Sequence, residues 1–589
     1  MGFIKSHYYS YKYKKFRKEV KRGTKDLASR LVLLKFFSIF WVILIVLKLF
    51  SLQISNSEFW ISWGNKQHTS KIKLAGIRGE ILDRNNKKLA ISVPAKSVYI
   101  RPKEIKNKQE VIEVLGTTLG LEREHLENKI NSTQPFVWVK RQIPPHLSKE
   151  IESKKILGIG SLTEAKRYYP LNGSASHLIG KVGVDGNGLL GIEAKYEKQL
   201  NSDIKTLTFL KDALGNQIQY NDENYKSEKQ KSLILTIDAE LQVIADEEIE
   251  ATRVEHNAKR VIAIMVDPDT GEILTLSQAP NINFNSNQIQ TKEDLVNFAV
   301  EGAFEPGSTF KPLVTAVALD KGFVKETDLI ETENGKFKIG RNTIKDVHGS
   351  KILSVKDIVV QSSNIGMSKL GFMMGKDLLY QSLVDFGFGQ KTNIGLVGEA
   401  PGIFRNAKNW ATIDIATHSF GQGIAVTPLQ MIRAFSSLVN GGYLPELSLV
   451  ASDNNSNKNN FKQVISAETS TKIKEILVAV VEEPNGTGGK TKISGVEVGG
   501  KTGTAQKAKI DGRGYQQGAY IASFIGFVDG KNIGVNKQIV LLVMVDEPRG
   551  NSIYGGTVAG AAFFKKIKKN FLFFFNKEKL SKKKKLKKK

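Results

Sequence analysis

A run of nineteen residues from Phe36 to Ile54, FFSIFWVILIVLKLFSLQI, contains a single charged side chain, Lys48. A helix of this length spans the hydrocarbon core of a bilayer, which is about 30 Å thick. Lys48 lies near one end of the run, where a long side chain reaches the interface. No small-x-small cleavage site follows, which favours a retained signal anchor over a cleaved signal peptide. The chain is therefore predicted to cross a membrane once.

Most of the net charge of +27 sits at the two ends of the chain. Residues 1–30 carry ten Lys and Arg against two acids, and residues 561–589 carry thirteen Lys against one Glu. The basic residues before the apolar run predict a cytoplasmic N-terminus and a remainder on the other side of the membrane. Because a nucleic-acid-binding domain carries its charge on a folded face, no nucleic-acid partner is expected. The tail Phe571–Lys589 is predicted to be disordered or to rest on anionic lipid headgroups.

The 589 residues divide into several expected parts. We expect a basic tail at 1–35, the anchor at 36–54, a β-rich module at 55–230, a large mixed α/β domain at 231–568 and a basic tail at 569–589. The mixed domain opens with a strand at 233–238, a helix at 241–252 and a hairpin at 261–278, whose two apolar runs flank a DPDTG turn. Without cysteine, and with eight histidines spread singly, no zinc, iron–sulfur or disulfide site is expected.

The first motif with chemical meaning is EPGSTFKP, from Glu305 to Pro312. A helix is predicted to start at Ser308, which places Ser308 and Lys311 on one face. A serine hydroxyl needs a neighbour that takes its proton, and a lysine made neutral by burial and nearby positive charge can do so. The S-x-x-K pattern also occurs at Ser70, Ser202 and Ser581, so alone it carries little information.

The second motif is QSSNIG, which contains Ser362 and Asn364. A hydroxyl can relay a proton between Lys311 and a leaving amine, and an amide can orient the lysine and the substrate. The S-x-N pattern recurs at Ser452–Asn454, inside the low-complexity segment SDNNSNKNN. We prefer Ser362, because a low-complexity loop does not hold side chains rigidly.

The third motif, VEVGGKTGTAQ, holds the one K-T-G of the chain. Lys501 is predicted to supply a fixed positive charge, and Thr502 and Thr504 hydroxyls for a substrate carboxylate. Gly503 lets a substrate backbone approach the strand. The N–H groups of Thr504 and Ser308 are predicted to form an oxyanion hole.

The same stretch also fits the phosphate-loop pattern G-x-x-x-x-G-K-T, from Gly495 to Thr502. A phosphate loop follows a buried strand and opens a helix. Here a predicted helix and a Gly-rich linker precede the pattern, and GTAQKAKIDGRG after it is a poor helix start. The ATPase interpretation is therefore disfavoured.

Together, the order S-x-x-K, S-x-N, K-T-G behind a signal anchor is typical of penicillin-recognising serine enzymes. With these motifs, the chain closely resembles the class B penicillin-binding proteins, and among them the septal, FtsI-type peptidoglycan transpeptidases. IRGEILDRNNKKLA and GNGLLGIEAKYEKQL resemble motifs of the family's pedestal domain. GEAPGIFRNAKNW, HSFGQGIAVTPLQMIRAFSSLVNGG and VDEPRGNSIYGGTVAG resemble its transpeptidase domain, and the first two favour the division branch over the elongation branch.

The resemblance implies an α+β fold, an antiparallel sheet flanked by helices, behind a β-rich pedestal and one transmembrane helix. It implies a D,D-transpeptidase in which Ser308 is acylated by a stem peptide ending in D-Ala-D-Ala and Lys311 is the base. An amine of a neighbouring stem is the implied acceptor, and beta-lactams are implied inhibitors. No metal or organic cofactor is implied. A polytopic septal glycan polymerase and other division proteins are the implied partners at the bacterial inner membrane.

Other functions share these motifs. An elongation-type transpeptidase, a D,D-carboxypeptidase and a beta-lactamase are the alternatives among enzymes, although a lactamase needs no large anchored pedestal. A beta-lactam sensor or an inactive division scaffold would keep the fold and lose turnover. The three intact motifs favour an enzyme.

Overall fold

The computed structural model describes residues 3–74, 76–201, 205–211, 217–219, 231–286, 291–451, 461–509, 514–533, 537–550 and 552–560. The predicted basic tail at 569–589 and the polar loop Ser452–Asn460 lie outside these residues. The chain forms two compact units, Met1–Lys73 with Thr206–Tyr225, and Leu74–Lys205 with Lys226–Lys589.

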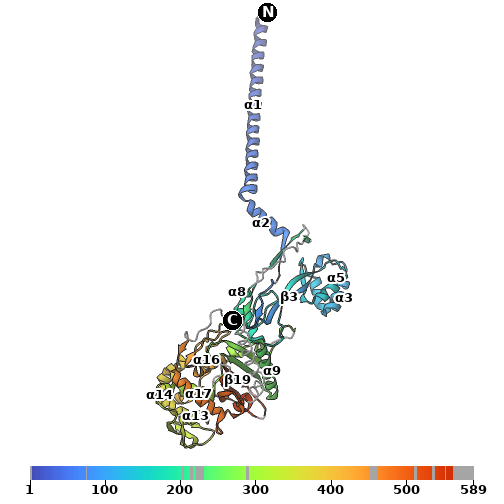
Figure 1. Cartoon of the computed structure of the whole chain (residues 1–589). Coiled ribbons are helices and arrows are strands. Elements are labelled where there is room, and N and C mark those ends of the chain that lie inside the picture. The colour runs from blue at the N-terminus through green and yellow to red at the C-terminus, as the bar shows by residue number, and fades with distance from the viewer. Residues whose placement is uncertain are drawn as a thin grey trace, which may run out of the picture. The chain divides into compact units, whose positions relative to one another are not determined.

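The first unit is built on a long helix, α1 (Phe3–Phe50), which continues through a π-helical turn at Ser51–Ser55 (Figure 1). Helix α2 (Ser57–His68) follows, and then a sheet in the order β1-β6-β7, from β1 (Thr69–Leu74), β6 (Lys205–Lys211) and β7 (Gln217–Gln219). The segment Arg30–Ser55 is long and apolar enough to cross a bilayer, and none of it is buried against protein. It contains the run predicted to be the anchor.

The second unit begins with the pedestal, a sheet around the long strand β3 (Lys88–Ile100). Its partners are β2 (Ile81–Leu82), β4 (Val137–Ile143) and β5 (Ile159–Tyr168), and β2 also pairs with β8 (Leu233–Ile234). Helices α3 (Lys108–Leu119), α4 (Arg123–Ile130) and α5 (Pro145–Ser153) share a small apolar core with β3. The sequence did not indicate these three helices.

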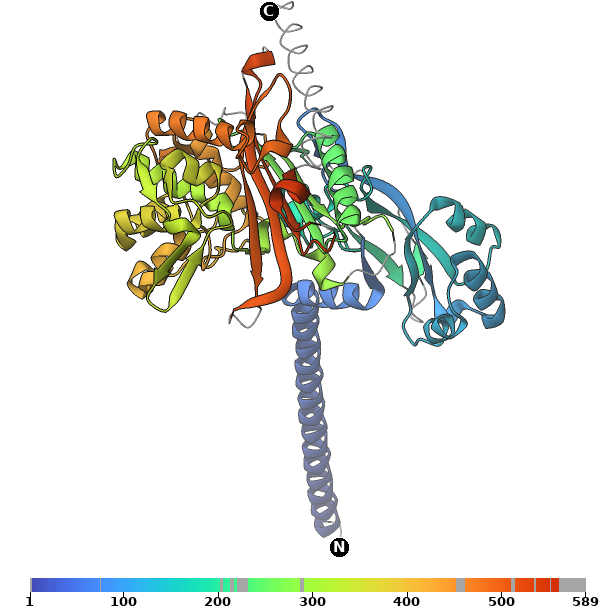
Figure 2. The same cartoon turned by 90° about the horizontal axis from the view of Figure 1, so that it is seen from below.

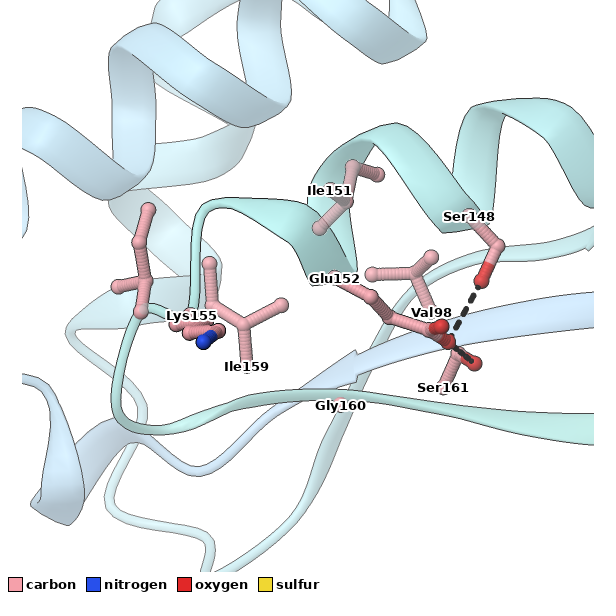
Figure 3. A pocket seen from close by; sticks show the side chains of 9 residues that line it. Val98, Ser148, Ile151, Glu152, Lys155, Ile159, Gly160 and Ser161 are labelled. Atoms are coloured by element: carbon pink, nitrogen blue, oxygen red, sulfur yellow. Dashed lines mark hydrogen bonds between the residues drawn. The ribbon is translucent and has the colours of Figure 1, made fainter.

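A cavity of about 110 Å³ lies between α5 and β5 of the pedestal (Figure 3). Glu152 projects into it and accepts hydrogen bonds from Ser161 and, at 3.0 Å, from Ser148. These hydrogen bonds, with Ser161 the strongest cause, lower the pKa of Glu152 although partial burial opposes them. The carboxylate therefore has local partners within the pedestal.

Two pedestal segments far apart in sequence meet at a buried carboxylate, Glu193. Its oxygens bind Arg78 Nε at 2.5 Å and Arg167 Nε at 2.6 Å, and all three side chains are almost fully buried. Arg78 belongs to the IRGE segment and Glu193 to the GIE segment, so the two pedestal motifs form one ion-pair cluster.

The second part of this unit is built on a five-stranded antiparallel sheet in the order β10-β9-β19-β18-β17. Its strands are β9 (Arg260–Val266), β10 (Ile273–Ala279), β17 (Glu497–Ala508), β18 (Tyr515–Asp529) and β19 (Gln538–Asp546). The predicted hairpin at 261–278 is confirmed as β9 and β10. The sheet is seen from another side in Figure 2.

Helices cover both faces of this sheet. Alternate residues of a strand point to opposite sides, so both faces present apolar side chains to be buried. In β9, Ile262 and Ile264 join the larger core and Val261 and Ala263 the smaller one. The larger core holds α12 (Lys311–Asp320), α14 (Asn364–Asp385), α16 (Pro428–Val439) and α17 (Ala467–Glu482), and the smaller one holds α9 (Ala239–Glu255). The expected fold, an antiparallel sheet flanked by helices, is confirmed.

Shorter elements complete the larger helical layer. They are β11 (Leu329–Glu331), the hairpin β12 (Lys336–Ile339) and β13 (Asn342–Lys345), β14 (Ile352–Ser354), α13 (Val355–Val360) and α15 (Thr412–Ser419).

Candidate active site

The first motif forms a tight turn that leads into a buried helix. Gly307–Phe310 is a 3-10 turn and α12 begins at Lys311, so the regular helix starts three residues later than predicted. Gly307 has φ +55°, and its N–H donates to Gly421 O at 2.9 Å. Ser308 is half-buried and Lys311 is fully buried. The turn thus presents the hydroxyl while the helix holds the amine inside the protein.

The amine of Lys311 connects the first motif to the second. Lys311 Nζ lies 2.6 Å from Ser362 O, 2.8 Å from Asn364 Oδ1 and 3.1 Å from Ser362 Oγ. Ser362 Oγ lies 3.0 Å from Ser308 Oγ. Two of these partners only accept, whereas the Ser362 hydroxyl can also donate. A charged amine can donate to all three oxygens, and once the amine is neutral its lone pair can accept from the Ser362 hydroxyl instead.

Burial is the main reason that the pKa of Lys311 falls well below the usual value for a lysine. The charge of Lys501 lowers the Lys311 pKa further, and the carboxylate of Asp346 acts in the opposite direction. A neutral lysine in contact with a serine hydroxyl can act as a general base near neutral pH.

The second motif is held by a carboxylate that no sequence motif indicates. Asp346, just after β13, accepts the N–H of Asn364 at 2.5 Å, the N–H of Ile365 at 3.0 Å and the Ser363 hydroxyl at 2.5 Å. Asp346 thereby caps the N-terminus of α14. Nothing in the local sequence marks it, because a single acid after a short strand is an ordinary surface pattern.

The third motif lies inside β17 and contributes a second buried amine. Lys501 is fully buried, with Nζ 3.3 Å from Thr502 O and 3.4 Å from Thr487 Oγ1. Burial lowers its pKa to about 7. The positive charge that the sequence predicts at Lys501 stays a prediction. Thr487, which also accepts from the Thr502 hydroxyl at 3.0 Å, was missed because its Gly-rich loop has no fixed spacing to the motif.

The strand β17 passes close to the Gly307–Phe310 turn at Gly503. A Cβ on Gly503 would lie 2.5 Å from Ser523 Oγ and 2.8 Å from Thr309 Cγ2. Only glycine allows this approach of β17 to the turn. Next along the strand, the Thr504 hydroxyl accepts the N–H of Gly555 at 3.0 Å. The structure thus places Gly503 beside Thr309 of the turn, and the carbonyl oxygen of Thr504 3.7 Å from the position of a Cβ on Gly307.

The phosphate-loop pattern and the other S-x-x-K copy within the described residues do not have the structure that their chemistry requires. Lys501 lies within a continuous strand, so Gly495–Thr502 is not a phosphate loop. The S-x-x-K at Ser70 falls on strand β1 rather than on a helix. The copies at Ser202 and Ser581, and the S-x-N at Ser452–Asn454, lie outside the described residues.

Two family models match this chain. The model of the penicillin-binding protein dimerisation domain matches residues 73–235, and that of the penicillin binding protein transpeptidase domain matches residues 261–569. The chain is 34% identical to the probable peptidoglycan D,D-transpeptidase PenA of Neisseria meningitidis, over 87% of each chain. It is 31% identical to the peptidoglycan D,D-transpeptidase FtsI of Escherichia coli, over 87% of this chain and 86% of the relative.

A solved structure shows the same fold. Penicillin binding protein 2X of Streptococcus thermophilus superposes with a TM-score of 0.68 at 23% identity, over 85% of this chain and 80% of that one. Because both domain models match in the order pedestal then catalytic domain, and relatives align along almost the whole chain, the protein belongs to the class B penicillin-binding proteins, as a serine-type peptidoglycan D,D-transpeptidase of the FtsI/PenA type.

Proposed function

We propose that this chain cross-links peptidoglycan at the division septum through an acyl-enzyme on Ser308. The observation that carries the proposal is the connection from the buried amine of Lys311 through the Ser362 hydroxyl to Ser308 Oγ. It joins a lysine of lowered pKa to a half-buried hydroxyl, which is what nucleophilic catalysis by serine requires.

Acylation begins when Ser308 Oγ attacks the carbonyl carbon between the two terminal D-alanines of a stem peptide. The Ser308 proton passes to neutral Lys311 through the Ser362 hydroxyl. The negative charge that develops on the carbonyl oxygen is stabilised by the N–H groups of Ser308 and Thr504. Charged Lys501, with the Thr502 and Thr504 hydroxyls, holds the terminal carboxylate.

Collapse of this intermediate breaks the amide bond. Lys311 returns the proton to the leaving nitrogen through Ser362, and one D-alanine departs with its amine intact. An amine of a neighbouring stem then attacks the Ser308 ester, gives a proton to Lys311 and forms the cross-link. Ser308 recovers its hydrogen from the same relay. Beta-lactams acylate Ser308 and remain bound.

The location proposed for this reaction is the outer side of the inner membrane. The basic residues before the apolar helix support a cytoplasmic N-terminus. The relatives named FtsI support a septal role, in which a polytopic glycan polymerase and other division proteins are the expected partners.

The acyl-enzyme is tested by labelling the full-length protein with fluorescent penicillin and following its intact mass for hours. We expect a stable adduct on wild type and none on Ser308→Ala. Ser70→Ala, which removes the S-x-x-K serine on β1, is the matched control and should label normally. Labelling of Ser308→Ala would refute the assigned nucleophile, and rapid loss of the adduct would favour a carboxypeptidase or lactamase.

The septal role is tested separately by depleting the protein from its own cells. Filaments with unfinished septa are the expected result. Rounded cells that still divide would assign the enzyme to elongation instead.

A further inference from the structure

Helix α2 exposes a dense group of large apolar side chains. Phe59, Trp60, Ile61 and Trp63 are 57%, 48%, 60% and 51% exposed. After α2 along the chain, the exposed large apolar side chains of the described residues are isolated, and none lies within four residues of another. Four such residues in five positions therefore form a local apolar surface that the rest of the described chain does not bury.

The chain turns sharply between the apolar helix and α2 (Figures 1 and 2). Asn56 leaves the helical conformation, with φ −115° and ψ 20°. Its N–H donates to Ser51 O at 2.9 Å and its Nδ2 to Ser51 Oγ at 3.1 Å, while its carbonyl accepts from Trp60 N–H at 3.1 Å. Hydrogen bonds on both sides of the bend fix the direction in which α2 leaves.

The length of the apolar segment sets the level at which this bend lies. Arg30–Ser55 has 26 residues, which as a helix extend about 39 Å at about 1.5 Å per residue. That length crosses the hydrocarbon core of about 30 Å and reaches the headgroup region on the far side. Helix α2 begins two residues later and is turned aside from α1, so it starts at the membrane surface.

The aromatic side chains of α2 gather on one side of the helix, whereas Ile61, two residues from Phe59 and from Trp63, does not lie on that side. Phe59 and Trp63 are four residues apart and Trp60 and Trp63 three apart, so these aromatic rings share one face of the helix. Glu58 and Ser62, also four apart, lie on another face. Tryptophan, with an apolar ring and one N–H donor, is enriched where lipid meets water.

We propose that α2 lies in the bilayer interface on the side opposite the N-terminus, with Phe59, Trp60 and Trp63 set among the lipid acyl chains just below the headgroups. The occupant of this surface is lipid, because α2 is continuous with the membrane-crossing segment and begins at the surface of the bilayer. Anchored there, α2 keeps the first residues of the strand that follows it, β1, next to the membrane.

The test uses the full-length protein in lipid nanodiscs and quenching of tryptophan emission by brominated lipids. Bromine is placed either near the headgroup end of the acyl chains or near their middle. The emission of α2 is the part lost in the double variant Trp60→Phe, Trp63→Phe, which keeps the apolar character of the face. Trp41, near the middle of the apolar segment, is the depth reference, and its emission is the part lost in Trp41→Phe.

The expected result is a larger loss of α2 emission with shallow bromines than with deep ones, and the reverse for Trp41. If neither lipid quenches the α2 emission while Trp41 is quenched, α2 faces water or protein and the proposal is wrong. If the deep lipid quenches α2 more strongly, α2 continues the membrane span and the proposal is also wrong. Neither failure affects the proposed acyl transfer at Ser308.

Discussion

The phenol of Tyr515 donates a hydrogen bond of 3.1 Å to the carboxylate of Glu305. Glu305 lies three residues before Ser308 in the chain. The other oxygen of Glu305 accepts the N–H of Gly423 at 3.1 Å. One carboxylate therefore links the hairpin of β17 and β18, and the loop that follows α15, to the residues just before the Gly307–Phe310 turn. Burial raises the pKa of Glu305, and these two hydrogen bonds oppose that shift.

Replacing Tyr515 by phenylalanine removes this tie and keeps the ring. We expect the second-order rate of acylation by fluorescent penicillin to fall about two- to tenfold, which corresponds to the loss of one hydrogen bond. Tyr443→Phe, on the short strand β15 (Tyr443–Leu444), is the control and should leave the rate unchanged. Equal rates for Tyr515→Phe and wild type would show that the tie does not position the site.

The two buried lysines predict a bell-shaped dependence of acylation on pH. The rate should rise with pH as Lys311 loses its proton, because only the neutral amine is a base. It should fall above about pH 7 as Lys501 loses the charge that holds the substrate carboxylate. Because the two amines interact, the apparent pKa values belong to the pair.

A matched pair of substrates separates the two limbs of this profile. A penicillin with its free carboxylate should show both limbs in stopped-flow acylation. Its methyl ester has no charge for Lys501 to hold and should keep the rising limb alone. The same falling limb with both compounds would mean that Lys501 does not act through the carboxylate.

Asp346→Asn should produce two effects at once. Removing a negative charge near Lys311 lowers the Lys311 pKa, so the rising limb should move to lower pH. The maximal rate should fall about tenfold, because Asn364 and Ser363 lose a charge-assisted acceptor. Asp357→Asn is the control. It alters a carboxylate that accepts a hydrogen bond from the Ser354 hydroxyl at the start of α13, and it should not move the rising limb of the pH profile. An unmoved limb in Asp346→Asn would exclude the electrostatic role.

Glu193→Gln should destabilise the pedestal strongly. The change leaves Arg167 buried without its counter-ion and leaves Arg78 only the partly exposed Glu197, at 2.7 Å, which costs about 3 to 5 kcal/mol. Glu240→Gln breaks a pair with Lys87 at the surface and should cost less than about 1 kcal/mol. Thermal unfolding followed by tryptophan fluorescence compares the two, and equal midpoints would show that the buried cluster is not a source of stability.

The sequence predicted the elements whose signal is local. The apolar segment and the hairpin of β9 and β10 follow from runs of adjacent residues, and the three motifs predict the candidate site residues by type and order. The capping of α14 by Asp346 and the contact of Thr487 with Lys501 arise only when segments distant in sequence fold together. Helices α3, α4 and α5 were not predicted. They are short, and their few apolar residues alternate with polar ones in a pattern that does not stand out from the neighbouring turns.

Ser362 has φ +62°, a left-handed conformation that is uncommon for a residue other than glycine. Its carbonyl and its hydroxyl both face Lys311 Nζ, so the amine helps to hold the backbone in that conformation. An alanine at position 311 would remove the proposed base and also release the peptide that places Ser362 beside Ser308. The activity lost in such a variant is therefore the sum of a missing proton acceptor and a relaxed loop, and it overstates the chemical contribution of the amine.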